Sequence, residues 1–331
     1  MNEGRVVVVG SYNHDFTWYC LRFPAIGETL AAEVFTAGHG GKGSNQAVAC
    51  ARQGASTCLI AAIGSDATGD AAVVMARDEQ IDARWQVLQD VATGSACVLV
   101  DSLGQNQIVV HAGANSRLDA AHVRTQSDAF ELARVTLMQF ETAMPPLRTA
   151  LELAKSNGAL CIINPAPARE DADPKLVGAC DLLIPNETEC LMMLRQAGCI
   201  APPKRLADIQ DADLANLTAK LAAPSVAVTL GEHGVFVAHR DGPRLHDMSR
   251  YYRLSAPTVR VIDTTGAGDV FCGSLAATIA MRPEDSLSEV ARLALHCAAH
   301  STERPGAGFS APTRRQVFQR FPGLMQGSGS T

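Results

Sequence analysis

Short apolar runs rich in β-branched residues recur along most of the chain, and stretches with a helical pattern separate them. The helical stretch at 44–54 (SNQAVACARQG) ends in Gly54, which suits the C-terminal cap of a helix. Continuous apolar strands that alternate with helices favour a parallel sheet covered on both faces. The pattern therefore predicts an α/β fold with a mostly parallel central sheet. The predicted strands occupy residues 6–10, 57–64, 134–140, 160–164, 181–185 and 225–230.

Two stretches interrupt this rhythm. Residues 12–40 contain no helical pattern and hold Pro24, Gly27 and Gly38 between short strand-like pieces. Residues 94–112 form two β-like runs around Asp-Ser-Leu-Gly, which is typical of a hairpin. We expect the two stretches to pair into a small β-sheet that acts as a lid. The expected division is a core of residues 1–11, 41–93 and 113–322, a β lid of residues 12–40 and 94–112, and a disordered polar tail of residues 323–331.

Composition and charge argue against several classes of partner. Of the 331 residues, 47% are apolar, which allows a sizeable core. The formal net charge is -6, without the basic excess that nucleic-acid binding requires. No apolar run approaches the roughly 18 residues of a membrane span, and the apolar run near the start is too short for a signal peptide. The ten cysteines form no C-x-x-C pair, which favours a reducing compartment. We expect a soluble cytoplasmic protein that binds neither nucleic acid nor membrane.

Polar residues and glycines follow most of the predicted strands. In an open parallel sheet, ligands bind beyond the carboxyl ends of the strands, so these residues are expected to converge on one edge. Taken singly, Asn13, Asp15 and Glu141 are better explained as turn residues. Their convergence nevertheless predicts a binding site. The residues concerned are Asn13, Asp15, Glu141, Asn164, Asn186, Glu189, Gly231 and the segment 266–269.

The segment VIDTTGAGD (261–269) raises a chemical question. Its strand-like start leads through two threonines into Gly-Ala-Gly and then Asp269. Glycines let the backbone approach a ligand, and N–H groups at a helix start bind anions. The loop lacks the lysine and hydroxyl of a Walker A sequence. A carboxylate there repels phosphate unless it takes a proton from an attacking hydroxyl, and the helix dipole favours its ionised form. The alternative is an acid that only stabilises a helix N-terminus, and the spacing alone leaves both open.

Glycines also cluster at 38–43, where Gly-His-Gly-Gly-Lys-Gly matches the dinucleotide pattern G-x-G-x-x-G. The match is weak because the segment follows a lid-like stretch and no βαβ unit frames it. A glycine-rich turn into a helix capped by Ser44 or Asn45 is one explanation. Glycines beside Lys42 and Asn45 would equally suit hydrogen bonding to a polyhydroxylated ligand.

Asn186-Glu-Thr-Glu189 follows the predicted strand at 181–185. Asparagine with glutamate three residues later is typical of a capping box, which is the stronger interpretation. The functional alternative is that Glu189 positions a Mg²⁺-bound water or a phosphate, and both roles are compatible. The histidines show no metal-like pairing, and His296 and His300 lack the H-E-x-x-H frame, so no zinc site is predicted.

Together these segments resemble the ribokinase branch of the PfkB-type carbohydrate kinase family, from about Arg5 to Phe318. The signatures occur in the family's order, and DTTGAGD is close to a family identifier. NPAPAR and GGKG-x-NQA are more similar to the ribokinase branch than to phosphofructokinase-like or adenosine kinase members. The matching segments are GSYNHDF, PAIGET, GGKGSNQA, HAGAN (111–115), LMQFE (137–141), NPAPAR (164–169), IPNETE (184–189), TLGEHG (229–234) and DTTGAGD (263–269).

The resemblance implies a ribokinase-like fold and ATP-dependent phosphorylation of a sugar, with Asp269 as the catalytic base beside an anion hole. The implied catalytic positions are Gly266, Ala267, Gly268 and Asp269. The implied sugar positions are Asn13, His14, Asp15, Gly41, Lys42, Gly43, Ser44, Asn45, Glu141 and Asp269. The implied nucleotide positions are Asn186, Thr229, Leu230, Gly231, Glu232, His233, Gly234, Gly268 and Asp269.

The resemblance also implies two cations and a partner subunit. Glu189 matches the acid tied to Mg²⁺, through water, and to phosphate. Family members use a monovalent cation, normally K⁺, and often form homodimers by pairing their lids. The positions that match the K⁺ site are Asp263, Thr265, Ser301, Arg304, Gly306 and Ser310.

The substrate implied by the resemblance is D-ribose, phosphorylated at its 5-hydroxyl to D-ribose 5-phosphate. His14, His39 and Pro305 depart from the usual family pattern. A deoxyribokinase or a nucleoside kinase is the alternative within the family, and Phe16, Trp18 and Tyr19 would offer a nucleoside an aromatic surface. Two alternatives belong to other classes, a dinucleotide-dependent oxidoreductase and a non-catalytic sugar sensor. Retention of Asp269 argues against the sensor, which needs no base.

Overall fold

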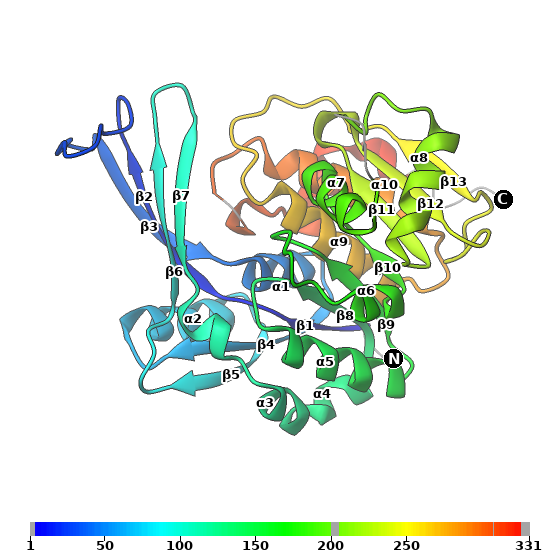
Figure 1. Ribbon diagram of the computed structural model, residues 1–331, viewed down its shortest axis with the longest axis horizontal. Coiled ribbons are helices and arrows are strands. Elements are labelled where there is room, and N and C mark those ends of the chain that lie inside the picture. Colours follow the sequence, from blue (N-terminus) through cyan, green and yellow to red (C-terminus); the bar gives the residue numbers. More distant parts are fainter. Residues whose placement is uncertain (1–3, 200–204, 307, 326–331) are drawn as a thin grey trace.

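The computed structural model describes residues 4–199, 205–306 and 308–325. Its larger sheet has nine strands (Figure 1). Its strands are β1 (Arg5–Val9), β4 (Ser56–Gly64), β5 (Asp82–Leu88), β8 (Ala133–Gln139), β9 (Leu160–Asn164), β10 (Leu182–Leu183), β11 (Ser225–Thr229), β12 (Val235–His239) and β13 (Tyr251–Leu254). They lie in the order β13-β12-β11-β10-β9-β8-β1-β4-β5. Across this sheet, all neighbouring strands between β11 and the edge strand β5 pair in parallel. At the opposite edge, β12 and β13 are antiparallel to their neighbours. The predicted mostly parallel sheet is confirmed.

Helices cover both faces of this sheet. One face packs against α1 (Lys42–Arg52), α2 (Ala67–Asp78), α9 (Ala267–Met281) and α10 (Leu287–Ser301). The other packs against α3 (Ala120–Thr125), α4 (Ser127–Glu131), α5 (Met144–Ser156), α6 (Pro174–Ala179), α7 (Glu187–Gln196) and α8 (Asp211–Thr218). Successive residues of a strand point to opposite faces, so Val7 and Val9 enter one apolar core while Val6 and Val8 enter the other. Such two-sided burial explains why the strands are continuously apolar.

Shorter helices complete the chain. Helix α11 (Arg314–Arg320) packs beside α10. The 3-10 helices are η1 (Gly113–Arg117), η2 (Ala219–Leu221), η3 (Gly231–His233), η4 (Gly308–Ser310) and η5 (Pro322–Met325). Residues 326–331 of the predicted disordered tail lie outside the described residues. Among the helices that the structure does describe, none combines the length and the apolar character needed to cross a membrane.

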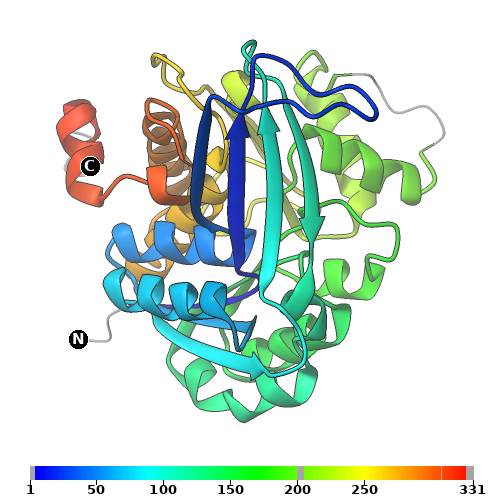
Figure 2. The same ribbon diagram turned by 90° about the vertical axis from the view of Figure 1, so that its left-hand side faces the viewer.

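Four strands form a second sheet, which we call the lid (Figure 2). They are β2 (Asn13–Tyr19), β3 (Val34–Gly40), β6 (Gly94–Val100) and β7 (Asn106–His111), in the order β3-β2-β6-β7. The two segments that interrupt the α/β pattern therefore pair as expected, with β2 and β6 parallel at the centre. The lid stands away from the core at the left of Figure 1 and crosses the front of Figure 2.

The predicted elements inside the core differ from the observed ones mainly at their ends. Each predicted strand from 6–10 to 225–230 is present. Helix α1 begins two residues earlier than expected, and Gly54, at φ +97°, follows its end as predicted. The strand-like interpretation of residues 261–262 is wrong. Val261 and Ile262 are 57% and 60% exposed and belong to a loop, in which the Ile262 N–H donates to the carbonyl of Thr302.

Candidate active site

A pocket of about 160 Å³ lies where the central strands end. Asn164 and Thr229 are the last residues of β9 and β11, and Ile184 directly follows β10. Helices α1, α7 and α9 contribute their first turns. Several strand-end residues of the sequence thus meet at one place. The lining residues are Lys42, Asn164, Ala166, Ile184, Asn186, Glu189, Thr229, Gly266, Gly268, Asp269 and Cys272.

Asp269 is in the first turn of α9 and is buried, with 6% of its surface exposed. The helix starts after Gly266, whose φ of +74° favours glycine. Asn45 Nδ2 donates to Asp269 Oδ2 over 3.0 Å, and Gln46 Nε2 donates to Oδ1 over 2.9 Å. The two donors come from neighbouring residues of α1 and bind different oxygens of the carboxylate. The carboxylate therefore lines the pocket in a fixed orientation.

The anion hole expected at Ala267–Asp269 is reduced by one donor. The N–H of Ala267 donates to the carbonyl of Thr264 over 3.2 Å. The first N–H groups of a helix have no acceptor inside that helix, which leaves those of Gly268 and Asp269 for an anion. The positive end of α9 thus lies beside the carboxylate of Asp269.

The glycine cluster at 38–43 brings the lid close to α1. Gly41 has φ +89°, and a Cβ on it would lie 2.6 Å from the backbone nitrogen of Asn13. The alternative of a helix capped by Ser44 or Asn45 is wrong, because Gly41 is the N-cap and no side chain caps α1. Ser44 Oγ donates instead to the carbonyls of Gly40 and Gly41.

Glu141 anchors this segment from the end of β8. Its Oε2 accepts from Ser11 Oγ over 2.5 Å and from the N–H of Lys42 over 2.8 Å. Ser11 Oγ in turn accepts from the N–H of Gly43 over 3.1 Å. Ser11 was not among the predicted site residues, since a single serine after a strand carries no distinctive pattern. Its buried hydroxyl links Glu141 to the glycine-rich segment at Gly43, and both are predicted site residues.

Asn13 and Asp15 lie on β2, at the end of the lid where β2 pairs with the last residues of β3 before α1. Asn13 Oδ1 accepts from Asn115 Nδ2 over 2.8 Å, so the HAGAN segment orients this side chain. Gly40 lies against Asp15, because a Cβ on Gly40 would be 2.1 Å from Asp15 Oδ2. Burial, with the negative charges of Glu141 and Asp269, raises the pKa of Asp15 to about 6. Asp15 therefore titrates close to neutral pH.

His14 and His39 form a cluster with the buried Tyr12. The Tyr12 hydroxyl lies 2.7 Å from His39 Nδ1 and 3.3 Å from His14 Nδ1. Neighbouring residues on a strand point to opposite faces, so the side chain of His14 points away from the side of Asn13 and Asp15. It packs against Phe16 and His39 instead. Burial lowers the pKa of both histidines.

Asn186 and Glu189 form a complete capping box at the start of α7. Glu189 Oε2 accepts from the N–H of Asn186 over 2.8 Å, and Oε1 accepts from its Nδ2 over 2.9 Å. Burial raises the pKa of Glu189. The charge of Asp269, with those of Glu141 and Glu189, raises the pKa of Lys42 despite burial. A hard carboxylate in a pocket beside Lys42 fits the water-mediated Mg²⁺ role, and capping does not exclude it.

The segment 229–234 joins Asn186 through its first residue. Thr229 forms a β-bridge with Asn186, and its N–H donates to the carbonyl of Pro185. The turn closes when the N–H of Leu230 donates to the carbonyl of Gly234. Gly234 has φ +88°, and a Cβ on it would lie 1.9 Å from the carbonyl oxygen of Leu254. Asn186 and Thr229 thus reach the pocket together.

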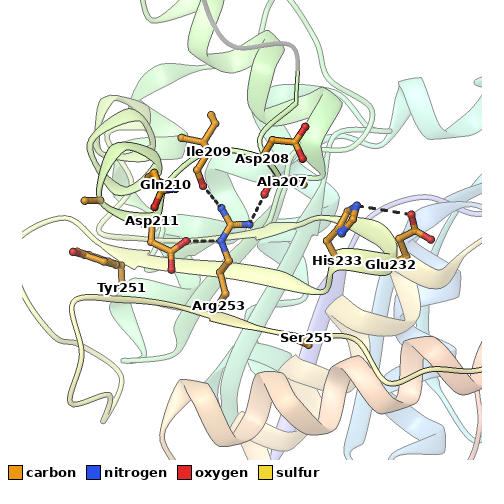
Figure 3. Close-up of a pocket in the computed structure, with 11 residues that line it drawn as sticks. Ala207, Asp208, Ile209, Gln210, Asp211, Glu232, His233, Tyr251, Arg253 and Ser255 are labelled. Atoms are coloured by element: carbon orange, nitrogen blue, oxygen red, sulfur yellow. Dashed lines mark hydrogen bonds and ion pairs between the residues drawn. The ribbon is translucent and has the colours of Figure 1, made fainter.

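Glu232 and His233 lie elsewhere, on a wider pocket of about 690 Å³ (Figure 3). Their side chains lie 3.8 Å apart, and His233 Nε2 lies 3.1 Å from Arg205, next to the loop that Arg253 holds. Arg253 donates to Asp211 Oδ1 over 2.5 Å and to the carbonyl of Ile209 over 2.7 Å. The side chains of Glu232 and His233 therefore do not line the pocket of Asp269.

The positions that match the family's K⁺ site lie mainly on two loops that contact each other. Asp263 Oδ1 accepts from the N–H of Thr265 over 2.9 Å, and Oδ2 accepts from the N–H of Gly306 over 3.1 Å. The N–H of Arg304 donates to the carbonyl of Ser301 over 3.4 Å. Ser310 lies in η4, close to α1. Carboxylate and carbonyl oxygens suit a hard monovalent cation, so these residues fit one chemically.

Comparison with known proteins defines the class. A family model described as pfkB family carbohydrate kinase matches residues 3–314. A ribokinase of Haemophilus influenzae is 34% identical over 316 residues, covering 95% of this chain and 97% of the relative. The structure of a Giardia lamblia ribokinase is similar with a TM-score of 0.83 and 29% identity, covering 97% and 99% of the two chains. The structure of an Arabidopsis thaliana ribokinase complexed with ribose and ATP is similar with a TM-score of 0.79 and 27% identity, and the match covers 96% of this chain and 98% of that one.

The protein is therefore a phosphotransferase that acts on an alcohol group. It belongs to the pfkB family of carbohydrate kinases, and the resemblance noted in the sequence is confirmed. Its fold, a large mostly parallel sheet with helices and a smaller separate sheet, is the ribokinase-like fold.

Proposed function

We propose that this protein phosphorylates D-ribose at the 5-hydroxyl with ATP, giving D-ribose 5-phosphate and ADP. The observation that carries the proposal is the buried Asp269 at the start of α9, held by Asn45 and lying in one pocket with Lys42 and Glu189. The similarity to ribokinases, one of them complexed with ribose and ATP, supports the choice of sugar.

In the proposed reaction, Asp269 takes the proton of the 5-hydroxyl as the sugar oxygen attacks the γ-phosphorus of ATP. The bond from that phosphorus to the β–γ bridging oxygen breaks, and ADP leaves. Phosphoryl transfer needs in-line positioning and charge neutralisation more than covalent chemistry from the protein. The N–H groups of Gly268 and Asp269 and the ammonium of Lys42 meet the charge that develops on the transferred group.

The sugar would lie between the lid and α1. Asp15 is suited to accept hydroxyl hydrogens, and Glu141 and Ser11 shape the backbone of Gly41–Asn45 that would bind other hydroxyls. The lid then excludes water, so that ATP is not hydrolysed in place of transfer.

We further propose a cation at each of two places. Mg²⁺ would neutralise the ATP phosphates, with Glu189 holding one of its waters. K⁺ would bind the loops of Asp263, Thr265, Ser301, Arg304, Gly306 and Ser310, and replacing it by a bulky organic cation should then lower the rate. A cytoplasmic location and a homodimer formed through the lid, both predicted from sequence, remain part of this proposal.

A panel of acceptors tests the substrate. ADP release is measured with ATP, Mg²⁺ and K⁺ against D-ribose, 2-deoxyribose, other pentoses, fructose and several nucleosides. D-ribose should give the highest kcat/KM by about tenfold or more, which is roughly 1.4 kcal/mol of discrimination. A preferred deoxyribose or nucleoside would replace the substrate and keep the mechanism. Sugar binding without turnover on any acceptor would favour the sensor.

A further inference from the structure

We propose that Gln46 is a positioning residue for Asp269, and that Gln139 acts on the same carboxylate through Gln46. The inference rests on the proposed role of Asp269 as the base. It concerns two glutamines in α1 and β8 that carry no assigned function in the sequence motifs. Both side chains are fully buried, although glutamine is seldom found inside a protein core.

The two glutamines form a continuous chain of amides that ends on the carboxylate. Gln139 Nε2 donates to Gln46 Oε1 over 2.6 Å. Gln46 Nε2 donates one hydrogen to Asp269 Oδ1 and the other to Asn164 Oδ1, both over 2.9 Å. The chain thus connects β8 and β9 to the first turn of α9 through α1.

The direction of every amide in this chain is determined by its ends. Asn164 Nδ2 donates to the carbonyl of Ile184 over 2.8 Å, so Asn164 Oδ1 must face Gln46. An ionised carboxylate only accepts hydrogen bonds, so the nitrogen of Gln46 must face Asp269. A reversed Gln46 would put its oxygen against both Asn164 Oδ1 and the carboxylate. The arrangement therefore selects one orientation of Gln46.

Gln139 supports this orientation of Gln46, but one of its own polar atoms is left without a hydrogen bond in the part of the chain that the structure describes. Its Oε1 is buried and has no hydrogen-bond partner among the described residues. A Cβ on Gly10 would lie 2.1 Å from that oxygen, so β1 packs tightly against it. An unsatisfied buried acceptor is unfavourable and calls for an explanation. Support for the orientation of Gln46 provides one.

The result is a carboxylate with both oxygens held and lone pairs left for the substrate. Asn45 holds Oδ2 and Gln46 holds Oδ1. A carboxylate offers about four acceptor sites, so two remain for a hydroxyl hydrogen. Rotation of Asp269 would break both bonds. Other charged or titratable groups that act on the surroundings of Asp269 are Asp15, Lys42, Glu141, Glu189 and Cys272.

The test replaces Gln46 by methionine, which keeps the length of the side chain and removes the donor. Hydrogen bonds to charged groups are the stronger kind, so kcat of Gln46→Met should fall at least about tenfold. The KM for D-ribose should change less than about twofold, because Asp269 is the only one of the predicted sugar positions to which the Gln46 side chain donates a hydrogen bond. Gln139→Met should lower kcat by less, and should have no further effect in the Gln46→Met background.

Gln53→Met is the matched control. Gln53 follows the same helix, is equally buried and donates one hydrogen bond, to the carbonyl of Pro312, far along α1 from Asp269. The Gln53→Met variant should lose about as much thermal stability as Gln46→Met, but its kcat should stay within about twofold of the wild-type value. A purely structural role for Gln46 would make the two variants alike, which overturns the inference.

Two further measurements separate this inference from the proposed function. In the Asp269→Ala background, Gln46→Met should leave the residual rate unchanged, and a full additive loss would contradict positioning. A crystal structure of Gln46→Met should show the Asp269 carboxylate turned or in two conformations, independently of activity. An unmoved carboxylate overturns the inference even if D-ribose is phosphorylated. A wild-type protein that phosphorylates no acceptor contradicts the proposed function alone.

Discussion

Asn45 Nδ2 donates to Asp269 Oδ2 over 3.0 Å, although 224 positions separate the two residues in the chain. The contact joins the first turn of α1, next to the glycine cluster, to the first turn of α9. One side chain therefore links the segment proposed to hold the sugar with the proposed base. The geometry needed to bring a hydroxyl to the carboxylate is built into the fold.

Asp269→Asn should lower kcat by roughly 10²–10⁴, the usual scale for a lost general base, because an amide cannot take the proton. The amide keeps the size of the side chain, so the affinity for D-ribose should change little. Steady-state rates and calorimetric sugar binding check the two parts. A variant with near-native kcat would remove Asp269 from the chemistry.

The efficiency with D-ribose should depend on pH through Asp15. Its pKa is raised to about 6, so the carboxylate is largely ionised above pH 7 and protonated below pH 5. Sugar binding that uses the ionised form weakens as pH falls, and kcat/KM for D-ribose should drop with a midpoint near pH 6. The step should be absent in Asp15→Asn, which should be weak at every pH. The same midpoint in Asp15→Asn would assign the titration to another group.

Glu189→Gln should separate the two roles of Glu189. Glutamine also closes a capping box, so stability should change little, while the lost charge should raise the Mg²⁺ concentration needed for half-maximal rate several-fold. Glu289→Gln is the matched control, since Glu289 closes a similar capping box with Ser286 on α10, outside the pocket. Identical Mg²⁺ titrations for both variants would reduce Glu189 to a cap.

A buried polar cluster should be important for stability but not for catalysis. Asp247 Oδ2 lies 3.0 Å from His239 Nε2 and accepts from the Tyr252 hydroxyl over 2.5 Å. Burial opposes the charge, but hydrogen bonds from His239, Tyr252 and Ser288 outweigh it and lower the pKa of Asp247. Leaving a buried donor without its acceptor costs about 1–3 kcal/mol, and Asp247→Ala removes the acceptor of several donors, so it should lower the free energy of unfolding by at least about that amount.

The pH dependence gives this prediction a sign. A carboxyl whose pKa is lowered by folding contributes stability at pH values above its unfolded pKa and loses it as pH falls. The difference in the free energy of unfolding between wild type and Asp247→Ala should therefore be largest near pH 7 and decrease as the pH falls. Asp241→Ala, which removes an exposed partner of Arg240, should cost less than about 1 kcal/mol in the same denaturant titrations. Equal losses in the two variants would contradict the burial argument.

Much of the fold follows from local patterns in the sequence. Continuous apolar strands such as 160–164 are visible because both faces of the central sheet are buried. Strands at or near the edges are harder to see. β5 (Asp82–Leu88) and β13 (Tyr251–Leu254) are partly exposed and carry charged and aromatic residues, so they lack a continuous apolar run. Val261 and Ile262 show the opposite error, because two β-branched residues predict a strand where the structure has an exposed loop.

The candidate site divides in the same way. Asp269, Asn186 and Glu189 lie in segments whose glycines or caps give a local pattern. Gln46 and Gln139 do not, because a glutamine in a helix or strand is unremarkable until the tertiary fold buries it next to a carboxylate. Glu232 shows the converse, since its place in a matching motif does not determine which pocket its side chain lines.

The most direct test is to identify the product by ³¹P NMR after incubation with ATP, Mg²⁺, K⁺ and D-ribose. The account predicts one new phosphomonoester, coupled to the C5 protons of ribose and formed in equal amount with ADP by the wild type. Asp269→Asn should form it at least about a hundredfold more slowly. ADP formed without a sugar ester, or an ester on another hydroxyl, would contradict the central claim.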